Sequence, residues 1–174
     1  MGFTGAQGLF PTVIPAGISG SSATIVGTLS VQTATVGTGA DTNETDLITY
    51  AVPANTLAKD GQALMVTVWG RFGANANAKT VKIYWGTTTR TIHSGSNQND
   101  NGWMAVFYVT RTSATAQRLF GWGVRHTGNV SSVPATTNSL QDTTTAVTVK
   151  VTGTNGTAVA NDIQQDGMIV QYIG

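Results

Sequence analysis

Two histidines and eight carboxylates are the side chains of this 174-residue sequence that could carry out acid–base or nucleophilic chemistry. His93 lies close to Ser94 and Ser96, and a nucleophilic serine needs a histidine and an acid beside it. Proximity along the chain does not supply the geometry of such a triad. We therefore interpret His93 and His126 as surface or interface residues without a catalytic role.

Five of the carboxylates fall in two stretches: Asp41, Glu44 and Asp46 in one, Asp162 and Asp166 in the other. Glycoside hydrolysis needs two carboxylates across a cleft, and Ca²⁺ needs several oxygen ligands, which the first stretch could supply together with Asn43. The spacing of an EF-hand loop is absent. Acidic residues also begin turns and keep sheet edges soluble. We expect that the protein is not an enzyme and binds no cofactor. The alternative for the first stretch is a Ca²⁺ site near residues 41–46.

The composition points away from nucleic acids and membranes. Only 10% of the residues are charged and the formal net charge is +1, so no basic patch is expected. Residues 1–10 lack the features of a secretory signal, and no apolar stretch is long enough to cross a bilayer. The chain has no cysteine, which leaves its core and oligomerisation as sources of stability. Few charges and many hydroxyls favour a protein that works inside an assembly or on a particle.

The elements that would position these residues are strands. Thr and Val favour strands, and Gly and Asn favour tight turns. The sequence predicts strands at residues 23–36, 47–52, 63–72, 80–86 with a continuation at 87–94, 103–111, 117–126, 146–152 and 168–173. A polar break is expected at 41–46 and a long loop at 127–144. We expect an all-β protein, an antiparallel β-sandwich of the jelly-roll type with about eight strands and an extended N-terminal arm.

Some of these strands are apolar on both faces. Residues 103–109 read Trp-Met-Ala-Val-Phe-Tyr-Val, and residues 168–173 read Met-Ile-Val-Gln-Tyr-Ile. A strand with one wet face alternates apolar and polar residues, so these strands need a second cover. The simplest second cover is another copy of the chain. The sequence does not say which parity faces the core, and the candidate interface residues are Trp103, Phe107, Tyr108, Ile169 and Tyr172.

The N-terminal region is predicted to be an arm that docks on another surface. Residues 1–35 are assigned to this arm and residues 36–174 to the jelly-roll domain. A free tail would be more polar than the arm, which suggests that it covers a surface. Its apolar residues are Phe3, Leu9, Phe10, Val13, Ile14 and Ile18.

Several runs of residues carry a family resemblance. The runs are 42–47 (Thr-Asn-Glu-Thr-Asp-Leu), 50–57 (Tyr-Ala-Val-Pro-Ala-Asn-Thr-Leu), 66–70, 75–80, 82–86 (Lys-Ile-Tyr-Trp-Gly), 151–156 and 160–163. Over about residues 40–174 the chain resembles the jelly-roll domains of bacteriophage virions. Such domains form the heads of phage fibres and the knobs of capsid decoration proteins, usually as trimers. The resemblance brings no catalytic residues, and the chain lacks the long shaft of a tail fibre.

The resemblance implies a structural protein of the virion. We expect a homotrimeric decoration protein or short head fibre on the capsid surface, anchored to the major capsid protein or another virion protein through the arm. The alternative is a receptor-binding head at the tail tip that recognises host surface polysaccharide through the loops at 95–102 and 127–144. The candidate glycan contacts in these loops are Asn97, Asn99, Asp100, Asn129 and Asn138.

Overall fold

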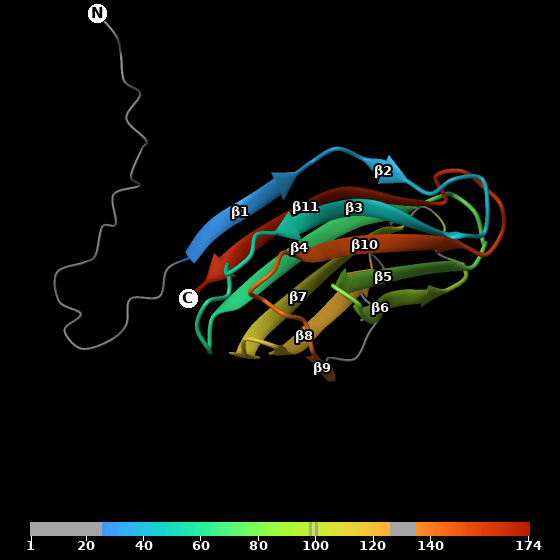
Figure 1. Cartoon of the computed structure of the whole chain (residues 1–174). Coiled ribbons are helices and arrows are strands. Elements are labelled where there is room, and N and C mark those ends of the chain that lie inside the picture. The colour runs from blue at the N-terminus through green and yellow to red at the C-terminus, as the bar shows by residue number, and fades with distance from the viewer. Residues whose placement is uncertain (1–25, 98, 100, 126–134) are drawn as a thin grey trace, which may run out of the picture.

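The protein is a β-sandwich of two antiparallel sheets, and in the described part of the chain every regular element is a strand (Figure 1). The computed structural model describes residues 26–97, 99, 101–125 and 135–174. The large sheet has the order β1-β11-β4-β7-β8-β9, and β2 pairs with β11 as well. The small sheet has the order β3-β10-β5-β6. The predicted all-β sandwich is confirmed.

The strands of the large sheet are β1 (Val26–Gln32), β2 (Val36–Gly37), β4 (Ala63–Phe72), β7 (Gly102–Ser113), β8 (Ala116–Arg125), β9 (Ala135–Ser139) and β11 (Ile163–Ile173). The strands of the small sheet are β3 (Glu44–Val52), β5 (Lys79–Trp85), β6 (Thr88–Gly95) and β10 (Val147–Asn155).

Eight of these strands make a jelly roll. Successive strands pass between the sheets so that β1, β11, β4 and β7 form one four-stranded layer and β3, β10, β5 and β6 form the other. The remaining long strand, β8, extends the large sheet beyond β7 and carries β9 on its outer edge. The loop predicted at 127–144 was therefore partly wrong, because β9 lies within it. The polar break predicted at 41–46 was also too long, because β3 begins at Glu44.

The boundary predicted for the arm is corrected by β1. Residues 26–32 pair with β11 along the edge of the large sheet, from Val26 opposite Ile173 to Gln32 opposite Met168. The side-chain amide of Gln32 also donates to the carbonyl of Thr49 in the small sheet, at 3.0 Å. Residues 26–35 therefore belong with the sandwich. The apolar arm residues Phe3 to Ile18 lie outside the described residues.

The core lies between the two sheets and is filled by alternate residues of each strand. Val66 and Val68 of β4 face Val149 and Val151 of β10, and all four are fully buried. Trp85 of β5 joins the two layers through a hydrogen bond, because its indole N–H donates to Oε1 of Gln117 in β8 at 3.1 Å. A buried polar group in such a core needs a partner of this kind.

Candidate functional site: an apolar sheet face and a polar groove

The outer face of the large sheet carries apolar side chains from five adjacent strands. We call this set the apolar face. It consists of Val26 and Val31 of β1, Ile169 and Ile173 of β11, Met65 and Trp69 of β4, Met104, Val106 and Tyr108 of β7, and Phe120, Trp122 and Val124 of β8. Residues paired across antiparallel strands point to the same side, so these side chains form continuous rows. Val31, Ile169, Val106 and Trp122 lie in one such row, in which Thr67 of β4 stands between Ile169 and Val106.

Much of this face is open to solvent. Val26 and Val31 are 62% and 59% exposed, and Met104, Phe120 and Val124 are 36–41% exposed. Among the described residues of this face, charged side chains lie only at its two ends, with the Arg71–Asp166 pair at one end and Arg118 at the other. The surface between them is uncharged across five strands.

Three aromatic side chains form a cluster at the β7–β8 side of the apolar face. The rings of Tyr108 and Trp122 are stacked with centroids 6.3 Å apart, and Phe120 meets Trp122 edge-on at 6.1 Å. These are favoured arrangements of aromatic pairs. The cluster is thus a rigid apolar surface that is already formed in the single chain.

The structure shows which face of each two-faced strand points into the core. Trp103 and Phe107 are 3% and 2% exposed and belong to the core between the sheets, so the interface predicted for them was wrong. Tyr172 packs against the same core. Tyr108 and Ile169 lie on the apolar face, as the prediction requires of interface residues.

Sequence reasoning did not predict the part of this face that β8 contributes. The alternation along residues 117–126 places Phe120, Trp122 and Val124 on one face of the strand and Leu119 on the other. Leu119 is the buried member, with 0% exposure. The spacing of these three large residues was the available signal. It shows that they share a face, but it does not show whether that face points outward or into the core.

The histidine and the carboxylates proposed for chemistry are structural in the described part of the chain. His93 is 3% exposed, with its ring 4.9 Å from that of Phe72, so the expected surface position was wrong. Asp41 begins a turn by accepting the backbone N–H of Asn43 at 2.8 Å. Asp162 is buried against Lys79 and Asp166 pairs with Arg71. No group of three or more potential metal ligands occurs among the described residues. His126 lies outside them.

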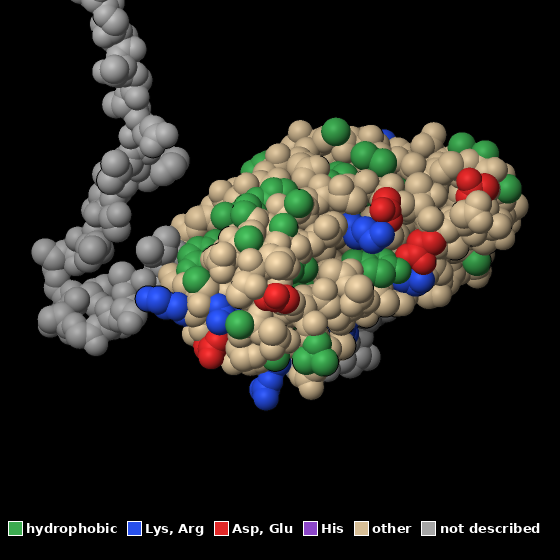
Figure 2. Space-filling model, in the orientation of Figure 1, with side chains coloured by type: hydrophobic (Ala, Val, Ile, Leu, Met, Phe, Trp, Pro, Cys, Tyr) green, Lys and Arg blue, Asp and Glu red, His purple; other side chains and the backbone are tan. Residues whose placement is uncertain are grey.

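The outer face of the small sheet is polar and is organised around Glu44. Its carboxylate accepts hydrogen bonds from the ammonium of Lys82 at 2.8 Å, the hydroxyl of Tyr84 at 2.5 Å and the hydroxyl of Thr152 at 2.7 Å. Partial burial acts to raise the pKa of Glu44, but these three hydrogen bonds outweigh it and lower the pKa to about 2. The hydrogen bond to Glu44 likewise raises the pKa of Lys82. On this side the few charged side chains lie scattered in a neutral surface (Figure 2).

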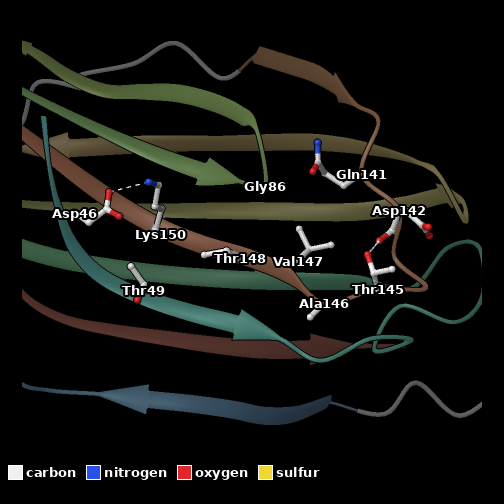
Figure 3. Close-up of a pocket in the computed structure, with 10 residues that line it drawn as sticks. All are labelled: Asp46, Thr49, Gly86, Gln141, Asp142, Thr145, Ala146, Val147, Thr148 and Lys150. Carbon is white, nitrogen blue, oxygen red and sulfur yellow. Dashed lines mark hydrogen bonds and ion pairs between the residues drawn. The ribbon is translucent and has the colours of Figure 1, made fainter.

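A groove of about 590 Å³ is hollowed into this polar face (Figure 3). Its floor is formed by β3 and β10, and its wall by the Gly86 turn and residues 141–146. The lining residues are Asp46, Thr49, Gly86, Gln141, Asp142, Thr145, Ala146, Val147, Thr148 and Lys150. Lys150 donates to Asp46 at 2.7 Å across the floor. No residue of this groove was predicted as a glycan contact, although Asp46 was among the carboxylates considered for Ca²⁺ binding or hydrolysis.

The described residues among those predicted to contact glycans do not form one cluster. Asn97 has a left-handed backbone (φ 59°) and donates its N–H to the carbonyl of Ala76 at 3.2 Å. Asn138 lies on β9 opposite Arg118, at the end of the large sheet away from the β6–β7 turn. Asn99 is in the turn between β6 and β7. Asp100 and Asn129 lie outside the described residues.

Comparisons with known proteins do not assign the chain to a family. No protein-family model matches the sequence, and no curated protein matches it. One solved structure, a peanut lectin with a nine-residue peptide, is similar over 88% of this chain and 99% of its own length, at 7% identity and a TM-score of 0.36. A search of the described residues for a helix long and apolar enough to span a membrane finds none.

Proposed function

We propose that this chain is a structural protein of a bacteriophage virion, a homotrimeric capsid decoration protein or short head fibre. The sequence resemblance over residues 40–174 supports the virion assignment, and the jelly roll is the fold that the resemblance implies. In this proposal the residues preceding β1 anchor the trimer to the major capsid protein or another virion protein. The outer face of the large sheet joins the copies.

The apolar face is the observation that carries this proposal. It spans five strands about 4.8 Å apart and, from Met65 to Trp69 of β4, four residue steps of about 3.3 Å, a projected area of about 300 Å². An apolar patch of a few hundred Å² on a soluble protein is often a functional surface. The aromatic and methionine side chains in it are those enriched in the centres of protein interfaces.

Another copy of the chain is the partner that fits this face best. The face has no charged side chain in its centre among the described residues, so a partner needs no compensating charge there. A second copy offers the same uncharged surface, and closed symmetric assemblies of one chain are the common form of oligomer. Burial between copies also removes this apolar surface from solvent, and a content of 10% charged residues fits a chain that works inside an assembly.

Charge placed on the apolar face tests the assembly. We expect the wild-type chain to sediment as a trimer and Trp122→Glu to sediment as a folded monomer, because Trp122 lies outside the core and its replacement leaves the sandwich intact. Thr91→Glu is the matched control, since Thr91 is exposed on the other sheet opposite Lys82. Circular dichroism checks that each variant is folded. A wild-type monomer, or a Trp122→Glu chain that still forms trimers, would contradict the interface.

A second candidate function is favoured by the polar groove. A receptor-binding head at the tail tip would present a polar surface to host polysaccharide, and the groove lies on the sheet opposite the apolar face. Cryo-electron microscopy of virions separates the two functions. Density at symmetry sites of the capsid supports decoration, and density confined to the tail tip supports receptor recognition.

A further inference from the structure

We propose that the polar groove on the small sheet is a binding site for a neutral, hydroxyl-rich oligosaccharide. The groove is formed within one chain by β3, β10, the Gly86 turn and residues 141–146 (Figure 3). The inference rests on the proposed function only in that trimerisation through the apolar face leaves the small sheet outward. Three such grooves on one particle would bind a repeating polymer with avidity.

The lining of the groove has the chemistry that sugar hydroxyls require. Its hydroxyl groups come from Thr49, Thr145 and Thr148, and Gln141 adds an amide that both donates and accepts. Its volume of about 590 Å³ falls within the range of ligand sites, about 300–1,000 Å³. These groups can donate hydrogen bonds to sugar hydroxyls and accept hydrogen bonds from them.

The wall of the groove is fixed before any ligand arrives. The backbone of Gln141 is held by Gln117, which donates to its carbonyl at 2.8 Å and accepts its N–H at 3.2 Å. The side-chain amide of Gln141 donates to the hydroxyl of Thr87 at 2.9 Å. A Cβ at Gly86 would lie 2.0 Å from Oε1 of Gln141, so only glycine lets this side chain occupy its place. A fixed wall lowers the entropic cost of binding.

The side chain of Asp142 is also held in place, and one of its two carboxylate oxygens is available to a ligand. Its Oδ1 accepts the N–H and the hydroxyl of Thr144, at 2.9 and 2.6 Å. Its Oδ2 accepts no hydrogen bond from the described part of the chain. The bonds from Thr144 lower the pKa of Asp142, so the group is an ionised acceptor at neutral pH. A sugar hydroxyl can donate to such an oxygen.

The charges of the groove disfavour acidic sugars. Lys150 is neutralised by Asp46 at 2.7 Å, which leaves Asp142 as the uncompensated charge of the lining. A uronate or sialate would bring a second negative charge close to Asp142 and would be repelled. The site therefore selects neutral sugars over anionic ones.

Binding of defined oligosaccharides tests the site. The probes are hexasaccharides of glucose, galactose, mannose and N-acetylglucosamine, with a hexasaccharide of galacturonic acid as the charged comparison, measured by saturation-transfer NMR and calorimetry on the full chain. We expect at least one neutral probe to bind, about tenfold or more tighter than the galacturonate. Thr148→Arg, which fills the groove floor, should abolish binding. Thr89→Arg, exposed on the same sheet outside the lining, should retain it.

Failure of this site is distinguishable from failure of the proposed assembly. Binding by the Trp122→Glu monomer should remain at the affinity of a single site, because the groove belongs to one chain. The groove proposal is overturned if no neutral probe binds, if galacturonate binds better than every neutral probe, or if Thr148→Arg binds like the wild type. A wild-type chain that binds neutral sugar but sediments as a monomer would overturn the assembly alone.

Discussion

Lys79 is a buried cation at the start of β5, and it holds the preceding loop against β11. Its ammonium donates to the side chain of Asn75 at 2.8 Å and to the carbonyls of Asn75 and Asn77 at 3.2 Å, and it lies 3.4 Å from Asp162. The side chains of Lys79 and Asp162 are both 0% exposed. Four oxygens thus replace the water that this charge loses on folding.

Lys79→Met should destabilise the fold by about 3–5 kcal/mol, because it leaves the carboxylate of Asp162 buried without a cation. Lys150→Met removes a comparable pair with Asp46 at the surface and should cost only about 0.2–1 kcal/mol. Urea unfolding of the two variants measures the difference. A Lys79→Met chain that loses no more stability than Lys150→Met would show that the buried pair is not needed. Asp162→Asn added to Lys79→Met should recover part of the loss.

Glu44 predicts how the fold responds to acid. In the unfolded chain the pKa of Glu44 is 4.5, and in the folded chain its hydrogen bonds lower it to about 2. These hydrogen bonds therefore contribute their full stability above pH 4.5, and this stability is lost as the pH falls toward 2. The carboxylate is one-third exposed, so solvent screening limits the contribution to about 1 kcal/mol. The free energy of unfolding of the wild type should exceed that of Glu44→Gln by this amount at pH 7, and the two should converge near pH 2. A difference independent of pH would contradict this assignment.

At the scale of elements, the positions of the strands could be predicted, but not which face of each two-faced strand points into the core. The alternation along residues 63–72 places Val66, Val68 and Phe72 on one face of β4, and all three are in the core. On β7 both faces are apolar, so burial depends on the neighbouring strand instead of on the residue itself. Phe107 turns inward because β8 presents Gly121 beside it, and Trp103 turns inward over Gly70 of β4. Which residues lie opposite each other depends on the register between neighbouring strands, and the residue pattern of a single strand does not reveal that register.

Gly121 should therefore tolerate no side chain. A Cβ at this position would lie 2.6 Å from the carbonyl oxygen of Val106 and 3.0 Å from the ring of Phe107. Gly121→Ala should lower the free energy of unfolding by about 1–3 kcal/mol through overpacking, as measured by urea unfolding. Gly27→Ala is a control with open space around the new methyl group and should change stability little. Equal effects of the two substitutions would disprove the close packing of Phe107 on Gly121.

At the scale of the whole molecule, the sequence predicted that a second cover was needed but not where it fits. The two-faced strands pointed to an outer apolar surface, and Tyr108 and Ile169 do lie on it. The groove escaped prediction because its residues come from four separate segments, and hydroxyls and amides of this kind are common throughout the chain. Only the jelly-roll topology brings residue 46 beside residue 150 and residue 86 beside residue 141.

Removal of the segment before β1 tests how the proposed trimer attaches to a capsid. β1 begins at Val26 and completes the edge of the large sheet, so deletion of residues 1–20 spares every described strand. We expect the truncated chain to fold and to sediment as the wild type does, but to lose binding to capsids in a co-sedimentation assay. The apolar residues from Phe3 to Ile18 would supply that binding through the surface they bury. Decoration by the truncated chain would place the anchor on the sandwich itself, whereas loss of the trimer would assign the segment to assembly between copies.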